Sequence, residues 1–301
     1  MKKMILSVLL AALLSGCAQI RNKDVTKQSL PLMSASEVVA SATDNDWRVV
    51  DGQNILKITL PTGDAYIELN EQLAPKHTQN IKKLAREGFY KNTSIYRFVE
   101  GFVAQGGDSS SKKLIKTADK TVPAEFYLTT NKPLLITELN GDGYAPVTGF
   151  LNGFAVAQNS AHTQTWQVHC SGVFAMARDN DINSASTEFF VTIGQGPRYL
   201  DKNITVFGRV LEGIEHFNRL ARTPIEGKAF NLITNIQVLG DVQSDKSIFK
   251  AMKTNSPVFK DLIRARKNRN EPWFVKAHNY VDVCGMPIPT KREVIPIRNN
   301  T

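Results

Sequence analysis

The sequence YRFVEGFVAQGGD spans residues 96–108 and alternates apolar with polar side chains before it ends in a double glycine. Such alternation is typical of a β-strand that leads into a turn. Arg97 lies in this pattern between two aromatic side chains. Burial of a guanidinium among aromatic residues is costly unless the charge has a partner or a task. The segment therefore predicts a strand whose arginine has a function.

Further short strands are predicted on both sides of this segment. Two alternating stretches flank a Pro-Thr-Gly-Asp turn and predict a hairpin. Pro75 begins a helical segment that Gly88 ends, and residues 213–222 predict a second helix. The predicted strands outside the opening segment are 55–60, 65–69, 173–177, 189–193, 205–210 and 232–239. Many short strands with two helices favour a mainly β fold, a closed antiparallel β-barrel capped by helices.

The N-terminus resembles a bacterial lipoprotein signal. Two lysines precede the apolar run Met4–Leu14, which is shorter than the roughly 20 residues that span a bilayer. The following LSGC, residues 14–17, resembles a lipobox, so we expect residues 1–16 to be removed and Cys17 to be lipidated. The alternative is an ordinary signal peptide with a chance cysteine. Because Ala18 follows and not Asp, the resemblance to enterobacterial lipoproteins implies a periplasmic protein anchored in the outer membrane.

Composition divides the remaining chain into a tether, a main domain and an extension. Residues 17–46 are polar and predict a tether from the membrane. Residues 47–243 hold the predicted strands and form the main domain. Within that domain, residues 109–171 predict an enlarged irregular loop, because glycines and a proline mark repeated turns.

Basic residues are concentrated in the C-terminal extension, residues 244–301. It holds 12 Lys or Arg against 5 Asp or Glu, whereas positive and negative charges balance in residues 4–243. A helix is predicted to begin with Ser256 as its N-cap, and residues 287–301 are predicted to be poorly ordered. The pI of 9.4 resembles that of nucleic-acid-binding proteins. An exported protein rarely meets nucleic acid, so the extension is either a solvated basic face or a contact for anionic lipid or cell-wall polymer.

The cysteine count favours a disulfide. If Cys17 carries lipid, Cys170 and Cys284 remain, and an even pair in an oxidising compartment predicts a bond between them. The alternative is two buried free thiols. A bond between these two residues would tie the C-terminal extension to the main domain.

Several sequence blocks occur in the order and spacing of a known family. They are FY at 89–90, FAMAR at 174–178, NSASTEFF at 183–190, LD at 200–201 and VFGRVLEG at 206–213. Together with residues 96–108, these blocks resemble the cyclophilin-type peptidyl-prolyl cis-trans isomerases over residues 56–239. The resemblance implies a cyclophilin-like β-barrel with an insertion within residues 109–171 and an additional basic helical extension.

The same resemblance assigns roles to individual residues. Arg97 would be catalytic: rotation about an amide has a barrier of about 18–20 kcal/mol, and a guanidinium donor can stabilise the twisted prolyl amide. The substrate-binding residues would be Phe102, Val103, Gln105, Ala177, Arg178, Glu188, Phe190, Tyr199 and Leu200. The resemblance implies no cofactor and no metal. From the residues alone, a structural role for Arg97 and plain core packing for Phe102 and Phe190 stay open.

Some positions differ from the residues that are usual in the family. The differences are Tyr96 for His, Val103 for Met, Glu188 for Gln, Tyr199 for Trp or Phe, and Ile204 for a polar or aromatic residue. Glu188 has the largest expected consequence. A carboxylate near Arg97 is expected to pair with it and to weaken its donation to the prolyl nitrogen.

These observations predict a lipid-anchored periplasmic prolyl isomerase. Its partners would be proline-containing segments of exported proteins, in which X–Pro isomerisation limits folding, and the membrane through the lipid anchor. The alternative is a non-catalytic peptide-binding envelope lipoprotein that keeps the groove and has lost turnover.

Overall fold

The computed structural model of the chain describes residues 33–224, 226–227 and 229–294. The expected signal peptide of residues 1–16 and the expected lipidation of Cys17 lie outside the described residues. In the ranges that are described, no helix is long and apolar enough to cross a membrane.

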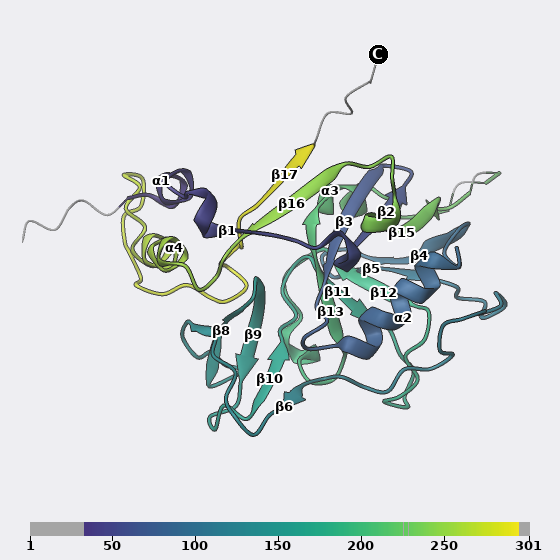
Figure 1. The fold of residues 1–301 in the computed structure, drawn as a ribbon, viewed down its shortest axis with the longest axis horizontal. Coiled ribbons are helices and arrows are strands. Elements are labelled where there is room, and N and C mark those ends of the chain that lie inside the picture. Colours follow the sequence, from purple (N-terminus) through teal and green to yellow (C-terminus); the bar gives the residue numbers. More distant parts are fainter. Residues whose placement is uncertain (1–32, 225, 228, 295–301) are drawn as a thin grey trace, which may run out of the picture. The chain divides into compact units, whose positions relative to one another are not determined.

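A nine-stranded antiparallel sheet closes on itself and forms a barrel (Figure 1). In spatial order its strands are β14 (Leu232–Ile233), β4 (Thr93–Val99), β5 (Val103–Gly107), β12 (Phe189–Thr192), β11 (Val173–Met176), β13 (Val206–Glu212), β3 (Gly63–Leu69), β2 (Ile55–Leu60) and β15 (Asn235–Val238). The consecutive strands β14 and β15 pair with β4 and β2, so one segment of chain joins the two edges of the sheet. At this seam, the N–H of Thr234 donates to the carbonyl of Thr59. The closure confirms the predicted mainly β barrel.

Aromatic side chains fill the barrel interior. Successive side chains of a strand point to opposite faces, so alternate residues of each strand meet inside. The fully buried residues there include Phe174, Phe189, Phe207 and Phe217. Helix α2 (Pro75–Arg86) packs against this core through Leu84, and α3 (Ile214–Asn218) contributes Phe217. Both predicted helices of the main domain are therefore confirmed, α3 with a shorter span.

A five-stranded sheet occupies much of the segment that was expected to be an irregular loop, residues 109–171. Its strands in spatial order are β6 (Leu128–Thr129), β10 (Gln164–Gln167), β9 (Phe154–Gln158), β8 (Val147–Leu151) and β7 (Thr137–Glu138). The loop prediction was wrong for these strands. Asn152 and Gly153, with φ of 48° and 88°, form the two-residue turn between β8 and β9. An Asn-Gly pair between apolar stretches is a strong hairpin signal, and the sequence interpretation overlooked it.

A three-stranded sheet joins the start of the main domain to the extension. It consists of β1 (Trp47–Val49), β16 (Ser247–Met252) and β17 (Thr290–Val294), with β16 in the centre. The expectation that residues 287–301 are poorly ordered was wrong for β17. Its backbone pairs with β16 from Thr290 to Val294, and this pairing satisfies groups that β16 would otherwise expose.

Helix α1 (Ala35–Ala40) lies within the segment that was expected to be a tether, residues 17–46. Ser34 and Glu37 form a capping box that begins the helix, a local signal for a helix start. Val38 is 4% exposed and belongs to the apolar cluster that also contains residues of the extension. The tether expectation was therefore wrong for α1, because its apolar face has a partner.

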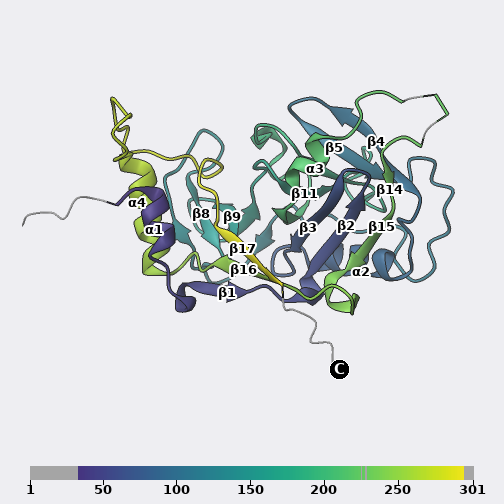
Figure 2. The same cartoon turned by 90° about the horizontal axis from the view of Figure 1, so that it is seen from above.

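Helix α4 (Pro257–Asn268) begins where the sequence predicts. The side chain of Ser256 accepts a hydrogen bond from the N–H of Phe259 at 3.1 Å, as an N-cap does. Phe259 and Leu262 are buried in the cluster that contains Val38 of α1. Both views show α1 and α4 side by side (Figures 1 and 2).

Candidate active site

Arg97 lies on the outer face of the barrel in a cross-strand row of predicted site residues. Strand β4 places it opposite Gln105 of β5, and Gln105 lies opposite Phe190 of β12. The Nη1 of Arg97 donates to the Oε1 of Gln105 at 3.1 Å. Arg97 is exposed and not buried among the neighbouring aromatic residues. Its charge therefore stays hydrated and accessible to a bound ligand.

A bulge in β4 directs two consecutive side chains to this face. The register of β4 against β5 shifts just before Arg97. Ile95 and Phe98 both pack with the barrel core, so Tyr96 and Arg97 between them both lie on the outer side. The hydroxyl of Tyr96 accepts a hydrogen bond from the Nε2 of Gln105 at 2.6 Å. The bulge thus brings Tyr96 to Gln105, which a regular strand would not do.

Glu188 binds Tyr96 and Gln105 instead of Arg97. Its Oε2 accepts from the Tyr96 hydroxyl and from the Nε2 of Gln105, the latter at 3.2 Å. Within residues 33–224, 226–227 and 229–294, no ion pair joins Glu188 to Arg97. The expected pairing was wrong, because the bulge presents Tyr96 as the donor to the carboxylate. Burial, reinforced by the hydrogen bond to Glu188, raises the pKa of Tyr96 well above its usual value.

An apolar surface adjoins the row that contains Arg97. Val103 and Phe190 are 2% and 6% exposed, and the half-buried Phe102 and Leu200 pack against the same cluster. The ring of Tyr199 stacks on Phe102 with the centroids 6.5 Å apart, while 62% of Tyr199 stays exposed. These predicted substrate-binding residues thus belong to one apolar group, in which Phe102 and Leu200 present partly exposed side chains.

Ala177 and Arg178 line a cavity that reaches Gln105 of the row. The cavity has a volume of about 320 Å³, and Gln105 and Glu188 also line it. The guanidinium of Arg178 donates to the carbonyl of Asn203 from Nε at 3.1 Å and from Nη2 at 3.0 Å. These bonds hold Arg178 in place, so the structure brings this second group of predicted residues together as well.

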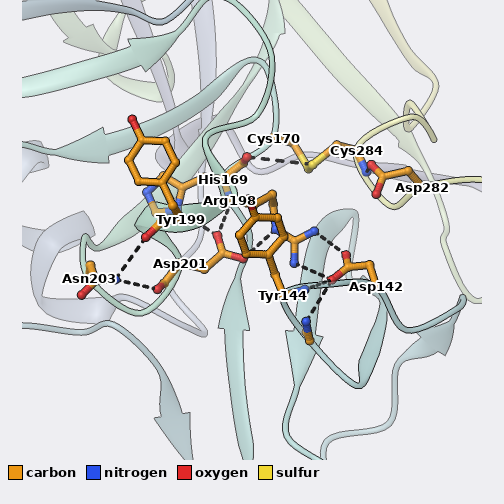
Figure 3. A network of polar contacts seen from close by, with 11 residues as sticks. Asp142, Tyr144, His169, Cys170, Arg198, Tyr199, Asp201, Asn203, Asp282 and Cys284 are labelled. Atoms are coloured by element: carbon orange, nitrogen blue, oxygen red, sulfur yellow. Dashed lines mark hydrogen bonds and ion pairs between the residues drawn. A yellow bond between two sulfur atoms is a disulfide. The ribbon is translucent and has the colours of Figure 1, made fainter.

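Arg198 organises a buried polar network beside the apolar surface (Figure 3). Its Nε donates to the Oδ2 of Asp201, and its Nη1 donates to the Oδ2 of Asp142, both at 2.6 Å. The side chains of Arg198, Asp142 and Asp201 are 7%, 9% and 7% exposed. Arg198 also begins the short 3₁₀ helix that carries Tyr199 and Leu200. The network therefore ties that helix to the inserted segment through Asp142.

His169 extends this network to Phe190. Its backbone N–H and its Nδ1 contact the Oδ1 of Asp201 at 2.9 and 3.1 Å. Its ring stacks on Phe190 with the centroids 6.4 Å apart. The next residue, Cys170, forms the predicted disulfide with Cys284, so the bond joins the extension to this side of the site.

The charges of the network stabilise one another. Burial would raise the pKa of Asp201, but the hydrogen bonds from His169 and the charge of Arg198 outweigh burial and hold this pKa below its usual value. Burial would lower the pKa of Arg198, and Asp201 and Asp142 raise it above its usual value. The sequence analysis named none of Asp142, His169 or Arg198 as site residues, because Asp142 and Arg198 lie 56 positions apart and no local pattern relates them.

Two glycines let the loop that leads into the 3₁₀ helix pack closely against neighbouring backbone. A Cβ on Gly194 would lie 1.8 Å from the carbonyl oxygen of Gly101, which precedes Phe102. A Cβ on Gly196 would lie 2.3 Å from the carbonyl oxygen of His169. Any other residue at these positions would push the loop away from the site, so both glycines serve backbone packing.

Comparison with known proteins assigns the family. The chain matches the family model described as cyclophilin type peptidyl-prolyl cis-trans isomerase/CLD over residues 55–240. The chain belongs to this family. It is therefore a peptidyl-prolyl cis-trans isomerase, an enzyme that accelerates rotation about X–Pro bonds.

Relatives of this cyclophilin occur in bacteria and eukaryotes. A probable peptidyl-prolyl cis-trans isomerase of Brucella suis biovar 1 (strain 1330) is 30% identical over 172 residues, which are 57% of this chain and 74% of the relative. A peptidyl-prolyl cis-trans isomerase of Dictyostelium discoideum is 29% identical over 160 residues, 52% of this chain and 80% of that protein.

A solved structure is similar over more of the chain. The crystal structure of cyclophilin AquaCyp293 from Hirschia baltica has a TM-score of 0.65 and 27% identity, and the match covers 87% of this chain and 98% of that one. This share exceeds the part of the chain within residues 55–240, so the similarity includes elements outside the cyclophilin domain.

Replacement of Glu188 by glutamine is expected to leave isomerase activity nearly unchanged. The amide oxygen of a glutamine can accept the hydrogen bonds from Tyr96 and Gln105 that the carboxylate accepts now. We expect kcat/KM for a proline-containing peptide to stay within about fivefold, a change of about 1 kcal/mol, because both hydrogen bonds are kept. Glu188→Ala is the matched control and is expected to be less active, since Gln105 then loses a partner. A restoration of activity by Glu188→Gln from an inactive wild type would contradict the geometry described here.

Proposed function

We propose that this cyclophilin is a lipid-anchored periplasmic isomerase that assists the folding of exported proteins, with Arg97 as its catalytic residue. One observation carries the catalytic part of the proposal: the exposed guanidinium of Arg97 is held by Gln105, and Gln105 lies opposite Phe190 of the apolar surface. A segment bound across this face can place its proline ring on the apolar surface and its amide next to the cation.

Arg97 stabilises the twisted amide better than the planar one. In the planar amide the nitrogen lone pair is delocalised, and rotation removes this delocalisation against a barrier of about 18–20 kcal/mol. The twisted nitrogen is a hydrogen-bond acceptor that the planar form lacks, so a positioned donor lowers the barrier. A guanidinium has five N–H donors, and the bond to Gln105 uses one of them.

The N-terminal sequence and the cysteines support the proposed compartment. Residues 1–16 resemble a signal peptide and Cys17 lies in a lipobox-like sequence. The disulfide between Cys170 and Cys284 is of a kind that persists in an oxidising compartment such as the periplasm. Ala18 after the lipidated cysteine favours the outer membrane. The clients there are exported proteins, whose X–Pro bonds isomerise in about 10–100 s without a catalyst.

The activity is tested with purified protein that begins at Ala18 and contains every described residue. It is expected to accelerate isomerisation of a short proline-containing peptide and refolding of an exported protein with a slow proline-limited phase. Peptide binding with no acceleration of either reaction would contradict the proposed catalysis and identify a peptide-binding module. The anchor is tested separately in cells: the wild type is expected to incorporate a labelled fatty acid and Cys17→Ser is expected not to, and equal labelling of the two would overturn the anchor.

A further inference from the structure

The loop of residues 269–280, which follows α4, exposes large apolar side chains to water. Trp273 is 74% exposed, Val275 is 102% exposed and Tyr280 is 46% exposed. The ring of Phe274 stacks on Trp273 with the centroids 3.8 Å apart. In Figure 2 this yellow-green loop extends beyond the end of α4. We call residues 269–280 the aromatic loop.

The aromatic loop holds its rings together outside the barrel core. Arg269, in the left-handed conformation with φ of 50°, ends α4 and turns the chain into the loop. Its guanidinium lies 5.2 Å from the centroid of Phe274, a cation–π contact that holds that ring beside Trp273. Exposure of such side chains is unfavourable, because their apolar surface stays in contact with water. Exposed apolar groups of this size that are rimmed by polar residues mark interaction sites.

Positive charge predominates in α4 and the aromatic loop together. From Pro257 to Tyr280 the chain holds six Lys or Arg against Asp261 and Glu271. Arg264 forms an ion pair with Asp261, which neutralises one of these cations. The six basic residues are Lys260, Arg264, Arg266, Lys267, Arg269 and Lys276. This combination of tryptophan, aliphatic residues and cations is the one found at the interface of an anionic lipid bilayer.

The described chain begins beside the same helix. Val38 of α1 is buried with Phe259 of α4, and the two helices lie side by side in both views (Figures 1 and 2). Met33, the first described residue, follows Cys17 by sixteen positions. Even fully extended, sixteen residues reach no further than about 55 Å. A lipid on Cys17 would therefore keep this end of the described chain close to a bilayer.

We propose that the aromatic loop and the basic residues of α4 form a docking surface for a bilayer that contains anionic phospholipid. Trp273, Phe274 and Val275 enter the interface between headgroups and acyl chains, and the cations contact lipid phosphates. This proposal rests on the proposed function only in one respect: the lipid anchor would bring the protein to a membrane in the cell. Lipid binding by the surface itself needs no anchor and is measurable without it.

The proposal is tested with the chain from Ala18 onward and vesicles of phosphatidylcholine, with or without phosphatidylglycerol. Co-sedimentation is expected with the anionic vesicles, and it is expected to weaken as salt is added, because exposed charges are screened. Of the three tryptophans, Trp166 is buried and Trp47 is half-buried, so a change in tryptophan fluorescence on vesicle binding reports mainly on Trp273. Its fluorescence is expected to shift to the blue and to be quenched by brominated acyl chains.

Paired variants separate the loop from general surface effects. Trp273→Ser is expected to weaken binding to anionic vesicles at least roughly tenfold, and Lys260→Glu and Lys276→Glu roughly fivefold each. Leu114→Ser also replaces an exposed apolar side chain by serine, and Lys112→Glu makes the same charge reversal, both in the irregular segment that follows β5; these variants are expected to leave binding unchanged. All five variants are expected to keep wild-type isomerisation of a peptide, which reports that they are folded.

Three results would overturn the proposal. The first is the absence of binding to anionic vesicles by the wild type, and the second is an equal effect of Trp273→Ser and Leu114→Ser. The third is a dimer that depends on Trp273, or binding to a soluble acidic polymer, with no vesicle binding. None of these bears on the isomerase assay or on fatty-acid labelling at Cys17, so failure of the docking surface is distinguishable from failure of the proposed function.

Discussion

Arg97→Ala is expected to lower kcat/KM for proline isomerisation by roughly 10²–10³-fold, the loss observed when a preorganised transition-state donor is removed. Arg97 is exposed and bonds to Gln105, so its removal leaves no buried charge unpaired and creates no cavity in the core. The free energy of unfolding is therefore expected to change by less than about 0.5 kcal/mol. The measurement is isomerisation of a short peptide, with urea unfolding of the same preparation.

Two further arginine variants make this prediction specific. Arg219→Ala removes an exposed guanidinium at the end of α3 and is expected to keep wild-type activity. Arg97→Lys keeps the charge but loses the planar fork, so it is expected to recover only part of the activity. A wild-type rate for Arg97→Ala would exclude Arg97 as the catalytic donor and leave it a role in peptide binding at most.

Loss of the disulfide is expected to produce the largest change in stability. Cys170 and Cys284 are separated by 114 positions, and closure of a loop of this length stabilises by roughly 4–5 kcal/mol in the chain-entropy model. The bond also holds residues 281–286 of the extension in the cluster that contains Phe190. Reduction of the wild type is expected to lower the urea midpoint by the amount that corresponds to this free energy.

The double variant Cys170→Ser/Cys284→Ser is the control for the reductant. Its urea midpoint is expected to equal that of the reduced wild type and to be the same with and without reductant. A midpoint that does not change when the wild type is reduced would show that packing of the extension, and not the covalent bond, holds residues 281–286 in place.

The local sequence contained more of the fold than the sequence interpretation used. The Asn152-Gly153 pair predicts a hairpin by itself, because both residues tolerate the positive φ that a tight turn requires. Ser34 and Glu37 likewise form a capping box that is visible in the sequence. Both signals occupy only a few consecutive residues. The glycines and polar residues around them favour a loop and a tether, and these two signals outweigh that preference locally.

Short stretches of sequence do not reveal the buried network around Arg198. Arg198, Asp142 and His169 come from separate segments and meet only after the inserted sheet packs beside the barrel. Nothing about an aspartate in a glycine-rich stretch indicates a buried partner. The pairing of β17 with β16 is also not evident from a short stretch of sequence, because β17 forms only when it can pair with β16, a separate strand.

The linear order of residues is enough to assign the family, the barrel and the identity of the groups at the site: an arginine, a glutamine, a carboxylate and several apolar side chains. Which of these groups bind one another depends on how the strands pair in space. A bulge in β4 places Tyr96 and Arg97 on one face, so Glu188 binds Tyr96 and Gln105 while Arg97 stays exposed. Side-chain direction in a sheet depends on register, and register is set by pairing between strands that can be far apart in the chain.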